Sequence, residues 1–262
     1  MTVTIDRHGP RDDLTWFQEY LDDLDPLEWQ IEALGTRPQH VKLVMTDAAK
    51  ELGLRQLLTP DDERLTDLFE LYVRSGAATL ARQAAGPGTF TVTLAGQEVE
   101  LDRATERRDP GFLEKLAALG AAAFDDQQSL ELTAAGLGHS TVLHAFHALV
   151  TGDPHAGELL RSAIEELDLS HCLLGPWNEH IELPLLKLAQ AVLDGGFEEQ
   201  LVATLGSHRH WYENCEANPG ESNARDPLGF VAFGPVCLAA IARQRGIAFA
   251  VRSEYLPECL VR

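Results

Sequence analysis

The sequence predicts a mainly α-helical protein, an irregular multi-helix bundle that contains one inserted β-hairpin and allows a short C-terminal strand. Apolar residues recur three and four positions apart along most of the chain, which places them on one face of a helix. One internal segment instead alternates apolar residues with threonine, as half-buried strands do. A shorter alternation of apolar residues near the C-terminus is compatible with a further strand.

Three helices are predicted in the N-terminal part of the chain. The first has its apolar face over residues 14–24 and is preceded by Asp12 and Asp13. The second covers residues 41–52 and is expected to end at Gly53. The third is expected to have Thr59 as its N-cap and Pro60 in its first position. Three acids then follow in the first turn, where negative charge interacts favourably with the helix dipole.

Further helices are predicted in the second half of the chain. Asp109-Pro110 and Asp153-Pro154 are each expected to start one, because a capping side chain followed by proline is typical of a first turn. A helix over residues 181–193 is expected to end at Gly195-Gly196. A short helix follows over residues 197–205.

The C-terminal region is expected to contain a late helix over residues 236–243. Pro235 starts or kinks this helix, and Gly246 ends it. Apolar residues at every second position of the segment 247–251 then allow a short final strand.

The internal alternating segment predicts a β-hairpin inserted between helices. Residues 89–94 alternate apolar side chains with threonine, Ala95-Gly96 turns the chain, and Val99 and Leu101 resume the alternation. An isolated hairpin is marginally stable in water, so this one is expected to pack on the helices. The hairpin also marks the expected division of the chain into N-terminal helices that end in the hairpin, residues 1–105, and a helical body, residues 106–262. The two segments are expected to pack as one globular unit.

Charge is the bulk property that says most about partners. The 262 residues include 41 acids and 21 bases, a formal charge of −20. Residues 1–30 have 8 acids and 2 bases, and residues 125–182 have 10 acids and 1 base. Phosphate groups bind basic surfaces, so neither nucleic acid nor an anionic membrane is an expected partner. A basic protein would be attracted to this surface, although an acidic surface can also serve solubility alone.

Cysteine usage and the lack of long apolar runs predict a soluble, cytoplasmic protein. The four cysteines form no CxxC pair, so neither a zinc knuckle nor a thioredoxin-type motif is present. The first residues contain no apolar run typical of a signal peptide. No later segment approaches the roughly 20 consecutive apolar residues of a membrane helix.

The sequence contains none of the common enzyme motifs GxGxxG, GxxxxGK[ST], GxSxG or HExxH, so neither an enzyme activity nor a cofactor is predicted. His139, His144 and His147 could bind a metal if a carboxylate joined them. No acid stands in the same turn, and the flanking residues are core-like, which favours ordinary core or surface histidines. Cys215 with His210 could form a nucleophilic pair, but the sequence supplies no third group to orient it.

Several short patterns carry a family resemblance. They are AFHALVTGD at residues 145–153, SHRHWY at residues 207–212 and SEYLP at residues 253–257. A Pro-Leu-Gly turn at residues 227–229 precedes the last apolar helix. Together these patterns resemble the immunity protein 49 family, which is similar in having a helical body of about this length and a small β element before the central helix. The resemblance covers residues 60–260, and the acidic N-terminal helix has no counterpart in it.

The resemblance implies that the protein binds and neutralises a cognate bacterial toxin domain from a polymorphic toxin system. Many toxin domains that attack nucleic acids have basic clefts, which an acidic inhibitor can occlude. The toxin partner is therefore expected to be basic. The acids expected to bind it come from the two acid-rich stretches: Asp22, Asp23, Asp25, Glu165, Glu166 and Asp168.

Two other functions stay open at the level of the sequence. One is a helical scaffold or regulatory protein-binding module without a toxin partner. The other is a metal-dependent hydrolase that uses His139, His144 and His147. The oligomeric state does not follow from the sequence.

Overall fold

The computed structural model describes residues 2–9, 14–84, 86–104, 108–171, 174–218 and 221–261. Within these residues the fold is mainly α-helical, as predicted, and its strands form two-stranded sheets. The helices are α1 Thr15–Asp22, α2 Leu27–Ala33, α3 Val41–Leu58, α4 Arg64–Gln83, α5 Phe112–Lys115, α6 Ala117–Ala123, α7 Gln127–Ala135, α8 Thr141–Thr151, α9 Ala156–Glu165, α10 Gly175–Trp177, α11 Leu183–Asp194, α12 Phe197–Asn214 and α13 Phe233–Gln244. The strands are β1 Val3–Ile5, β2 Thr89–Leu94, β3 Gln97–Asp102, β4 Glu216–Asn218, β5 Glu221–Ser222 and β6 Val251–Ser253.

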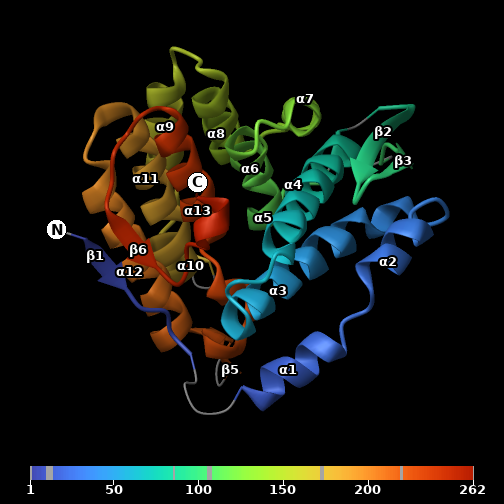
Figure 1. Cartoon of the computed structure of the whole chain (residues 1–262). Helices are drawn as coiled ribbons and strands as arrows, with labels where there is room; N and C mark the ends of the chain where they lie inside the picture. The colour runs from blue at the N-terminus through green and yellow to red at the C-terminus, as the bar shows by residue number, and fades with distance from the viewer. Residues whose placement is uncertain are drawn as a thin grey trace.

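The helices pack around one main core. In Figure 1, α3 and α4 lie side by side on the right, while α8, α9 and α11 to α13 lie on the left. Aromatic side chains join the two sides, because Phe233 of α13 contacts both Phe69 and Tyr72 of α4. The ring centroids are 6.1 Å and 4.9 Å apart, within the range of favourable aromatic pairs. The core therefore draws on helices from both halves of the chain.

The most apolar part of the chain forms the centre of this core. The segment Pro227–Gln244, which contains α13, is long and apolar enough to cross a membrane by length and composition alone. However, 83% of it is buried inside the fold. A helix that is apolar on all sides is expected in such a central position.

The α3 helix continues past Gly53, where the helix was predicted to end. Gly53 is buried within α3, where a Cβ atom would lie 1.9 Å from the carbonyl oxygen of Pro227. This proline begins a 3-10 turn, η4 (Pro227–Phe230), that packs against α3. The glycine therefore permits a close approach of two backbones and does not end the helix.

The predicted start of α4 was wrong by four residues. The helix begins at Arg64 and not at Pro60, and Thr59 follows the last residue of α3. Asp62 explains the shift, because its carboxylate accepts hydrogen bonds from the Arg64 N–H and the Arg55 guanidinium. The acids thus form a turn before the helix. The α5 and α9 helices likewise begin two residues after the prolines that were expected to start them.

The helix predicted over residues 181–193 begins with a π-helical turn. This turn, η2 (Asn178–Glu182), leads directly into α11, which ends before Gly195 as predicted. Gly195 and Gly196 both have positive φ angles, which glycine adopts without strain. The next helix, predicted to be short, is the 18-residue α12.

The predicted hairpin is confirmed. Strands β2 and β3 pair antiparallel, with Leu94 opposite Gln97 across the Ala95-Gly96 turn. Both turn residues have positive φ angles, as a tight two-residue hairpin turn requires. Val92 and Leu101 are fully buried in the main core, so the hairpin packs on the helices as expected.

The predicted C-terminal strand exists but begins later than expected. β6 starts at Val251 and pairs in parallel with β1, with Val3 opposite Val251 and Ile5 opposite Ser253. This pairing holds the two ends of the chain together (Figure 1). Strand β1 was not predicted, because three residues are too few to show an alternating pattern.

The expected division between residues 105 and 106 lies outside the described residues. It stays a prediction. Within the described residues, the main core contains side chains from both segments, such as Phe69 and Phe146.

Candidate functional site

The acid-rich N-terminal stretch forms an exposed helical segment, which we call the acidic arm. It consists of α1, α2 and their connection, residues 14–33. Its sequence contains no Lys, Arg or His. Its six carboxylates are all exposed: Glu19, Asp22, Asp23, Asp25, Glu28 and Glu32.

The arm is fixed to the body by its apolar face. Phe17 of α1 is buried in a cluster with Leu54 and Leu57 of α3 and with Phe230 of η4. The rings of Phe17 and Phe230 meet edge to face, with centroids 5.2 Å apart. Ile31 of α2 enters the main core. Because both helices are anchored, the outward acids have defined positions before any partner binds.

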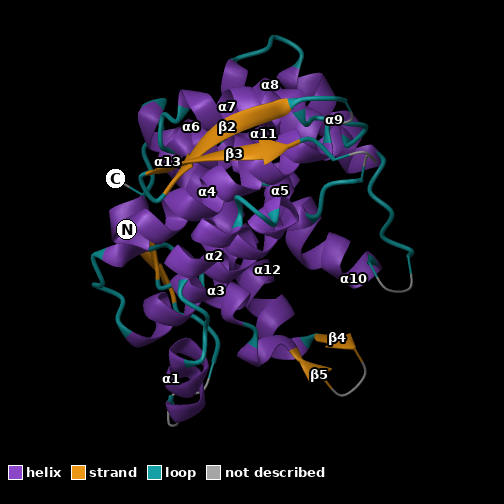
Figure 2. Ribbon diagram, turned by 90° about the vertical axis from the view of Figure 1, so that its right-hand side faces the viewer, coloured by secondary structure: helices purple, strands orange, loops and turns teal. Residues whose placement is uncertain are grey.

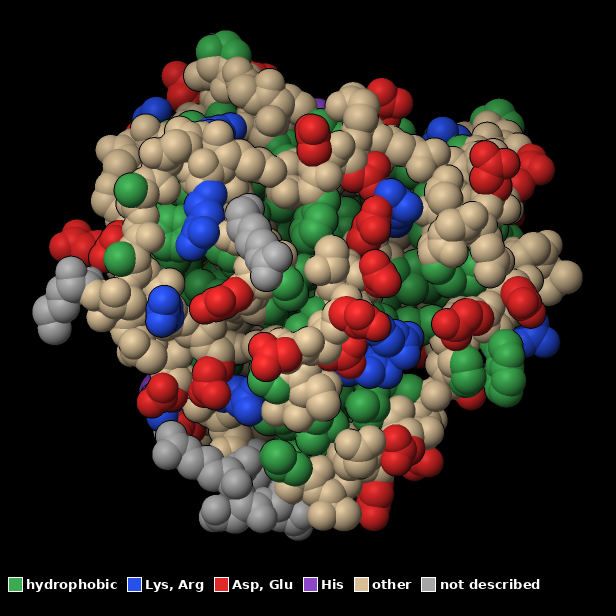
Figure 3. Space-filling model, viewed as in Figure 1, with side chains coloured by type: hydrophobic (Ala, Val, Ile, Leu, Met, Phe, Trp, Pro, Cys, Tyr) green, Lys and Arg blue, Asp and Glu red, His purple; other side chains and the backbone are tan. Residues whose placement is uncertain are grey.

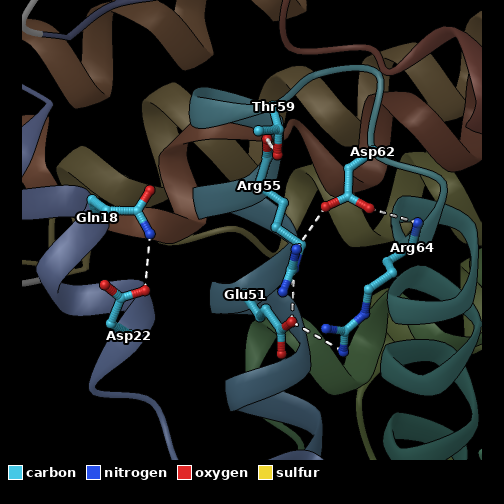
Figure 4. Close-up of polar contacts among 7 residues, drawn as sticks. All are labelled: Gln18, Asp22, Glu51, Arg55, Thr59, Asp62 and Arg64. Carbon is cyan, nitrogen blue, oxygen red and sulfur yellow. Dashed lines mark hydrogen bonds and ion pairs between the residues drawn. The ribbon is translucent and has the colours of Figure 1, made fainter.

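Three acids predicted to bind a partner lie at the C-terminal end of α1. Asp22 is the last helical residue, Asp23 is the C-cap, and Asp25 lies in the connection to α2. Negative charge at a helix C-terminus opposes the helix dipole, so this placement does not favour stability. Asp22 accepts a hydrogen bond from the Gln18 amide at 2.9 Å (Figure 4). No Lys or Arg of the described residues forms an ion pair with any of the three.

The arm also exposes two tryptophans. Trp29 of α2 is 67% exposed, and Trp16 of α1 is 39% exposed and lies beneath the Arg225 guanidinium. Figure 3 shows hydrophobic side chains flanked by acidic ones over α2, at the right of the view. Tryptophan is enriched among the residues that dominate binding energy in protein interfaces. The arm therefore combines large apolar anchors with negative charge that no described Lys or Arg pairs.

The second predicted group of acids lies at the end of α9 and has local bonding partners. Glu166 accepts hydrogen bonds from the hydroxyls of Thr141 at 2.5 Å and Ser162 at 3.2 Å. These bonds tie the end of α9 to the start of α8. Hydrogen bonds from the hydroxyl and N–H of Ser170 lower the pKa of Asp168. Glu165 is exposed at the last position of α9.

The structure does not bring the two predicted groups of acids together. Figures 1 and 2 both show α1 at one end of the molecule and α9 at the other. A single small contact surface therefore includes one group or the other. Among the arm acids, only Asp22 accepts a side-chain hydrogen bond from another described residue, whereas Glu166 and Asp168 each accept two. The arm acids are therefore the better candidates for binding a partner.

Two other acids near the arm, Glu51 and Asp62, are neutralised within the fold. Figure 4 shows the Arg55 guanidinium between Glu51, at 2.7 Å, and Asp62, at 2.6 Å. Arg64 adds a second ion pair to Glu51, at 3.2 Å. Burial alone would raise the pKa of Asp62, but hydrogen bonds from the Arg64 N–H and from Arg55 lower it. This network stabilises the junction of α3 and α4. Its two carboxylates and two guanidinium groups cancel, so it has no net charge to attract a partner.

The histidines predicted as an alternative metal site lie on and before α8. His144 contacts the carbonyl oxygen of Gly138 at 3.1 Å, and His139 is exposed. Burial, and to a lesser extent the nearby His144, lowers the pKa of His147. Within the part of the chain that the structure describes, no carboxylate joins these three histidines in a group that could hold a metal.

A different group of metal-binding side chains does come together. His180 of η2, His210 of α12 and Cys215 each offer one ligand atom, and these atoms lie within 4.8 Å of one another. The sequence indicates a pair of Cys215 with His210 but not His180, which lies 30 residues before His210. Partial burial and the charge of Glu179 raise the pKa of the Cys215 thiol. A raised thiol pKa disfavours the thiolate, so this is not an activated nucleophile.

A cavity of about 300 Å³ lies beside this group, between α3, α5, α12 and α13. His180 and His208 line it together with mainly apolar side chains. Its main charged feature is the buried Glu114 carboxylate, which forms an ion pair with Lys42 at 2.7 Å. The ion pair compensates the buried charge within the fold.

A comparison with family models identifies the family of this chain. The model for immunity protein 49 matches residues 59–260, most of the chain. The chain belongs to the immunity protein 49 family. Neither the comparison with curated proteins nor that with solved structures found a match. The family resemblance predicted over residues 60–260 is therefore confirmed.

Membership of the immunity protein 49 family indicates an immunity protein of a toxin system, a class that is generally non-enzymatic. The matched region begins just after the end of α3. It includes α9 and the group formed by His180, His210 and Cys215. The acidic arm lies before the matched region.

Proposed function

We propose that this protein neutralises a cognate toxin domain by binding it with the acidic arm, in the cytoplasm of a bacterial cell. The observation that carries the proposal is the contrast between two sets of acids. The acids of the arm are exposed and unpaired by the described cations, whereas the neighbouring acids Glu51 and Asp62 are neutralised by arginines. A basic partner would therefore meet uncompensated negative charge at the arm.

Charge and apolar anchors support this proposal together. Six carboxylates within 20 residues would attract a basic toxin domain and speed its association at low salt. Trp29 and Trp16 offer large rigid side chains for the centre of the contact. Because the arm is anchored by Phe17 and Ile31, binding would cost little ordering entropy.

The position of the arm in the sequence also supports the proposal. An immunity protein must recognise its own toxin, and toxins differ in their surfaces. The family match begins after the arm, at residue 59. We infer that the matched region supplies the helical body, while the arm supplies contacts that are particular to this toxin. No chemical step by the protein is required, because occlusion of the toxin suffices.

The test is co-expression with the toxin domain encoded next to this gene, scored by cell survival. The wild-type protein should protect the cells. The charge-reversal variant Asp22→Lys/Asp23→Lys/Asp25→Lys should lose protection, since it replaces attraction by repulsion. A matched control, Glu98→Lys/Glu131→Lys/Glu258→Lys, changes three exposed acids outside the arm and should protect fully.

A third variant separates the two predicted groups of acids. Glu165→Lys/Glu166→Lys/Asp168→Lys should retain protection if the arm is the interface. Loss of protection in this variant alone would move the interface to the end of α9. Absence of protection by the wild-type protein would favour a scaffold or regulatory role without this toxin.

A further inference from the structure

We propose that His180, His210 and Cys215 bind one thiophilic transition-metal ion, of which zinc(II) is the best match. One ligand atom from each side chain lies within 4.8 Å of the other two. The residues come from two elements, the π-helical turn η2 and the C-terminal end of α12. This site is distinct from the acidic arm and does not depend on the proposed toxin contact.

The distances are close to those of a bound state. In a tetrahedral zinc site with metal–ligand bonds of about 2.0–2.3 Å, neighbouring ligand atoms lie roughly 3.4–3.8 Å apart. The present atoms would need to approach by roughly 1–1.5 Å at most, by this geometry. Side-chain rotation can supply such a shift, because His210 is exposed and His180 and Cys215 are only partly buried. The backbone can therefore stay in place.

The local backbone explains how the three residues meet. The wider π-helical turn of η2 places His180 beside α12, and the rings of His180 and His210 lie with centroids 4.7 Å apart. Single π-helical turns often occur at functional sites. Cys215 follows α12 in an extended conformation, while its N–H still donates to the Trp211 carbonyl. The sulfur is thus held at the end of the helix that carries His210.

The donor set determines which ion fits. One thiolate and two imidazoles suit zinc, copper or cobalt, whereas magnesium and calcium prefer oxygen ligands. Three protein ligands leave a fourth position open for water. The Asn214 amide lies 3.4 Å from His210 Nδ1 and can help to orient that ring. Binding would connect η2 to the start of the β4–β5 hairpin, since Cys215 immediately precedes β4.

The test is metal titration of the full-length protein after treatment with a chelator. One equivalent of zinc should bind, and cobalt(II) should give a sulfur-to-cobalt charge-transfer absorption band. Cys215→Ser should abolish that band. His180→Gln should weaken zinc binding at least about tenfold, because loss of a direct ligand should lower metal affinity at least as much as loss of a residue that only hydrogen-bonds a ligand. Circular dichroism should show that both variants keep the helical fold.

Two control variants make the result specific. Cys259→Ser changes another partly buried thiol, and His139→Ala changes another exposed imidazole. Both should bind one equivalent of zinc with unchanged affinity. The proposal is wrong if the wild-type protein binds no zinc, or if Cys215→Ser and His180→Gln bind it as tightly as the controls. Either result leaves the toxin interface unaffected, because survival is scored separately.

Discussion

At the scale of single residues, a few close contacts determine which substitutions the fold tolerates. Gly53 is inside a helix although glycine disfavours helices, because the Pro227 backbone occupies the place of its side chain. Two buried histidines, His8 and His208, lie among aromatic rings where a charge would be costly. The contacts of Gly53 with Pro227 and of His8 with Tyr255 cannot be read from the sequence, because the partners are more than 150 residues apart along the chain.

Substitution of Gly53 tests the close contact with Pro227. Gly53→Ala should lower the free energy of unfolding by about 1–3 kcal/mol or more, because a Cβ atom would overlap the Pro227 carbonyl oxygen. Gly206→Ala is the matched control, since Gly206 is also inside a helix and has open space around it. It should raise stability by about 0.5–1 kcal/mol. Urea denaturation measures both, and equal effects of the two variants would contradict this explanation.

Stability should fall in mild acid because of the two buried histidines. Burial, aided at His8 by the nearby His208, lowers the pKa of His8 to about 3, and burial lowers that of His208 to about 4. Both pKa values are below the unfolded value of 6.5, so protonation favours the unfolded chain. Their contribution is therefore complete above about pH 6.5 and is lost as the pH falls, toward about 4 for His208 and about 3 for His8.

Urea denaturation at several pH values checks this prediction. Between pH 7 and pH 5 we expect a loss of roughly 1–2 kcal/mol for each histidine. His208→Gln keeps a donor for the Gly229 carbonyl, which His208 contacts at 3.0 Å, and should reduce the pH dependence. His139→Gln should not change it. A stability that is constant from pH 7 to pH 5 would show that these histidines are not buried as described.

At the scale of secondary-structure elements, local patterns predicted most helices and the hairpin but not their junctions. The β2–β3 hairpin follows from alternation and a two-residue turn, both of which are local. The β1–β6 pair joins residues 248 positions apart, such as Thr4 and Arg252. Because the two strands are so far apart along the chain, no local pattern predicts their pairing. The start of α4 was displaced because side-chain bonds of Asp62 compete with helical capping.

The same distinction applies to the candidate sites. The acids of the arm were predicted from charge density, which is a local property of the sequence. The group at Cys215 was only half predicted, because His180 reaches it from another element. The pairing of Glu51 with Arg55 four residues later could have been found from helical spacing.

The conformation of the β2–β3 turn can be tested by a substitution of Ala95. Ala95 has a φ angle of +45°, which is unfavourable for alanine, and the next residue is Gly96. Ala95→Asn should stabilise the protein by about 0.5–1 kcal/mol, because Asn-Gly is the preferred pair for this kind of turn. Thermal denaturation measures the change. Destabilisation by Ala95→Asn would mean that the turn does not have the described conformation.

At the scale of the whole molecule, we propose that stability and recognition belong to different regions. The family-matched body, which includes α4, α13 and the hairpin, supplies most of the buried residues of the main core. The arm contributes Phe17 and Ile31 to the interior and presents its charge outward. This separation would let the arm change with its toxin while the body keeps its fold.

The equilibrium dissociation constant of the complex with the purified toxin domain, measured by isothermal titration calorimetry, tests the central claim most directly. The variant Asp22→Lys/Asp23→Lys/Asp25→Lys should bind about 30- to 1000-fold more weakly than wild type, which corresponds to about 2–4 kcal/mol. The control Glu98→Lys/Glu131→Lys/Glu258→Lys should bind within about threefold of wild type, because rim and remote charges contribute little. Equal affinities of the two variants would contradict the assignment of the acidic arm as the toxin-binding surface.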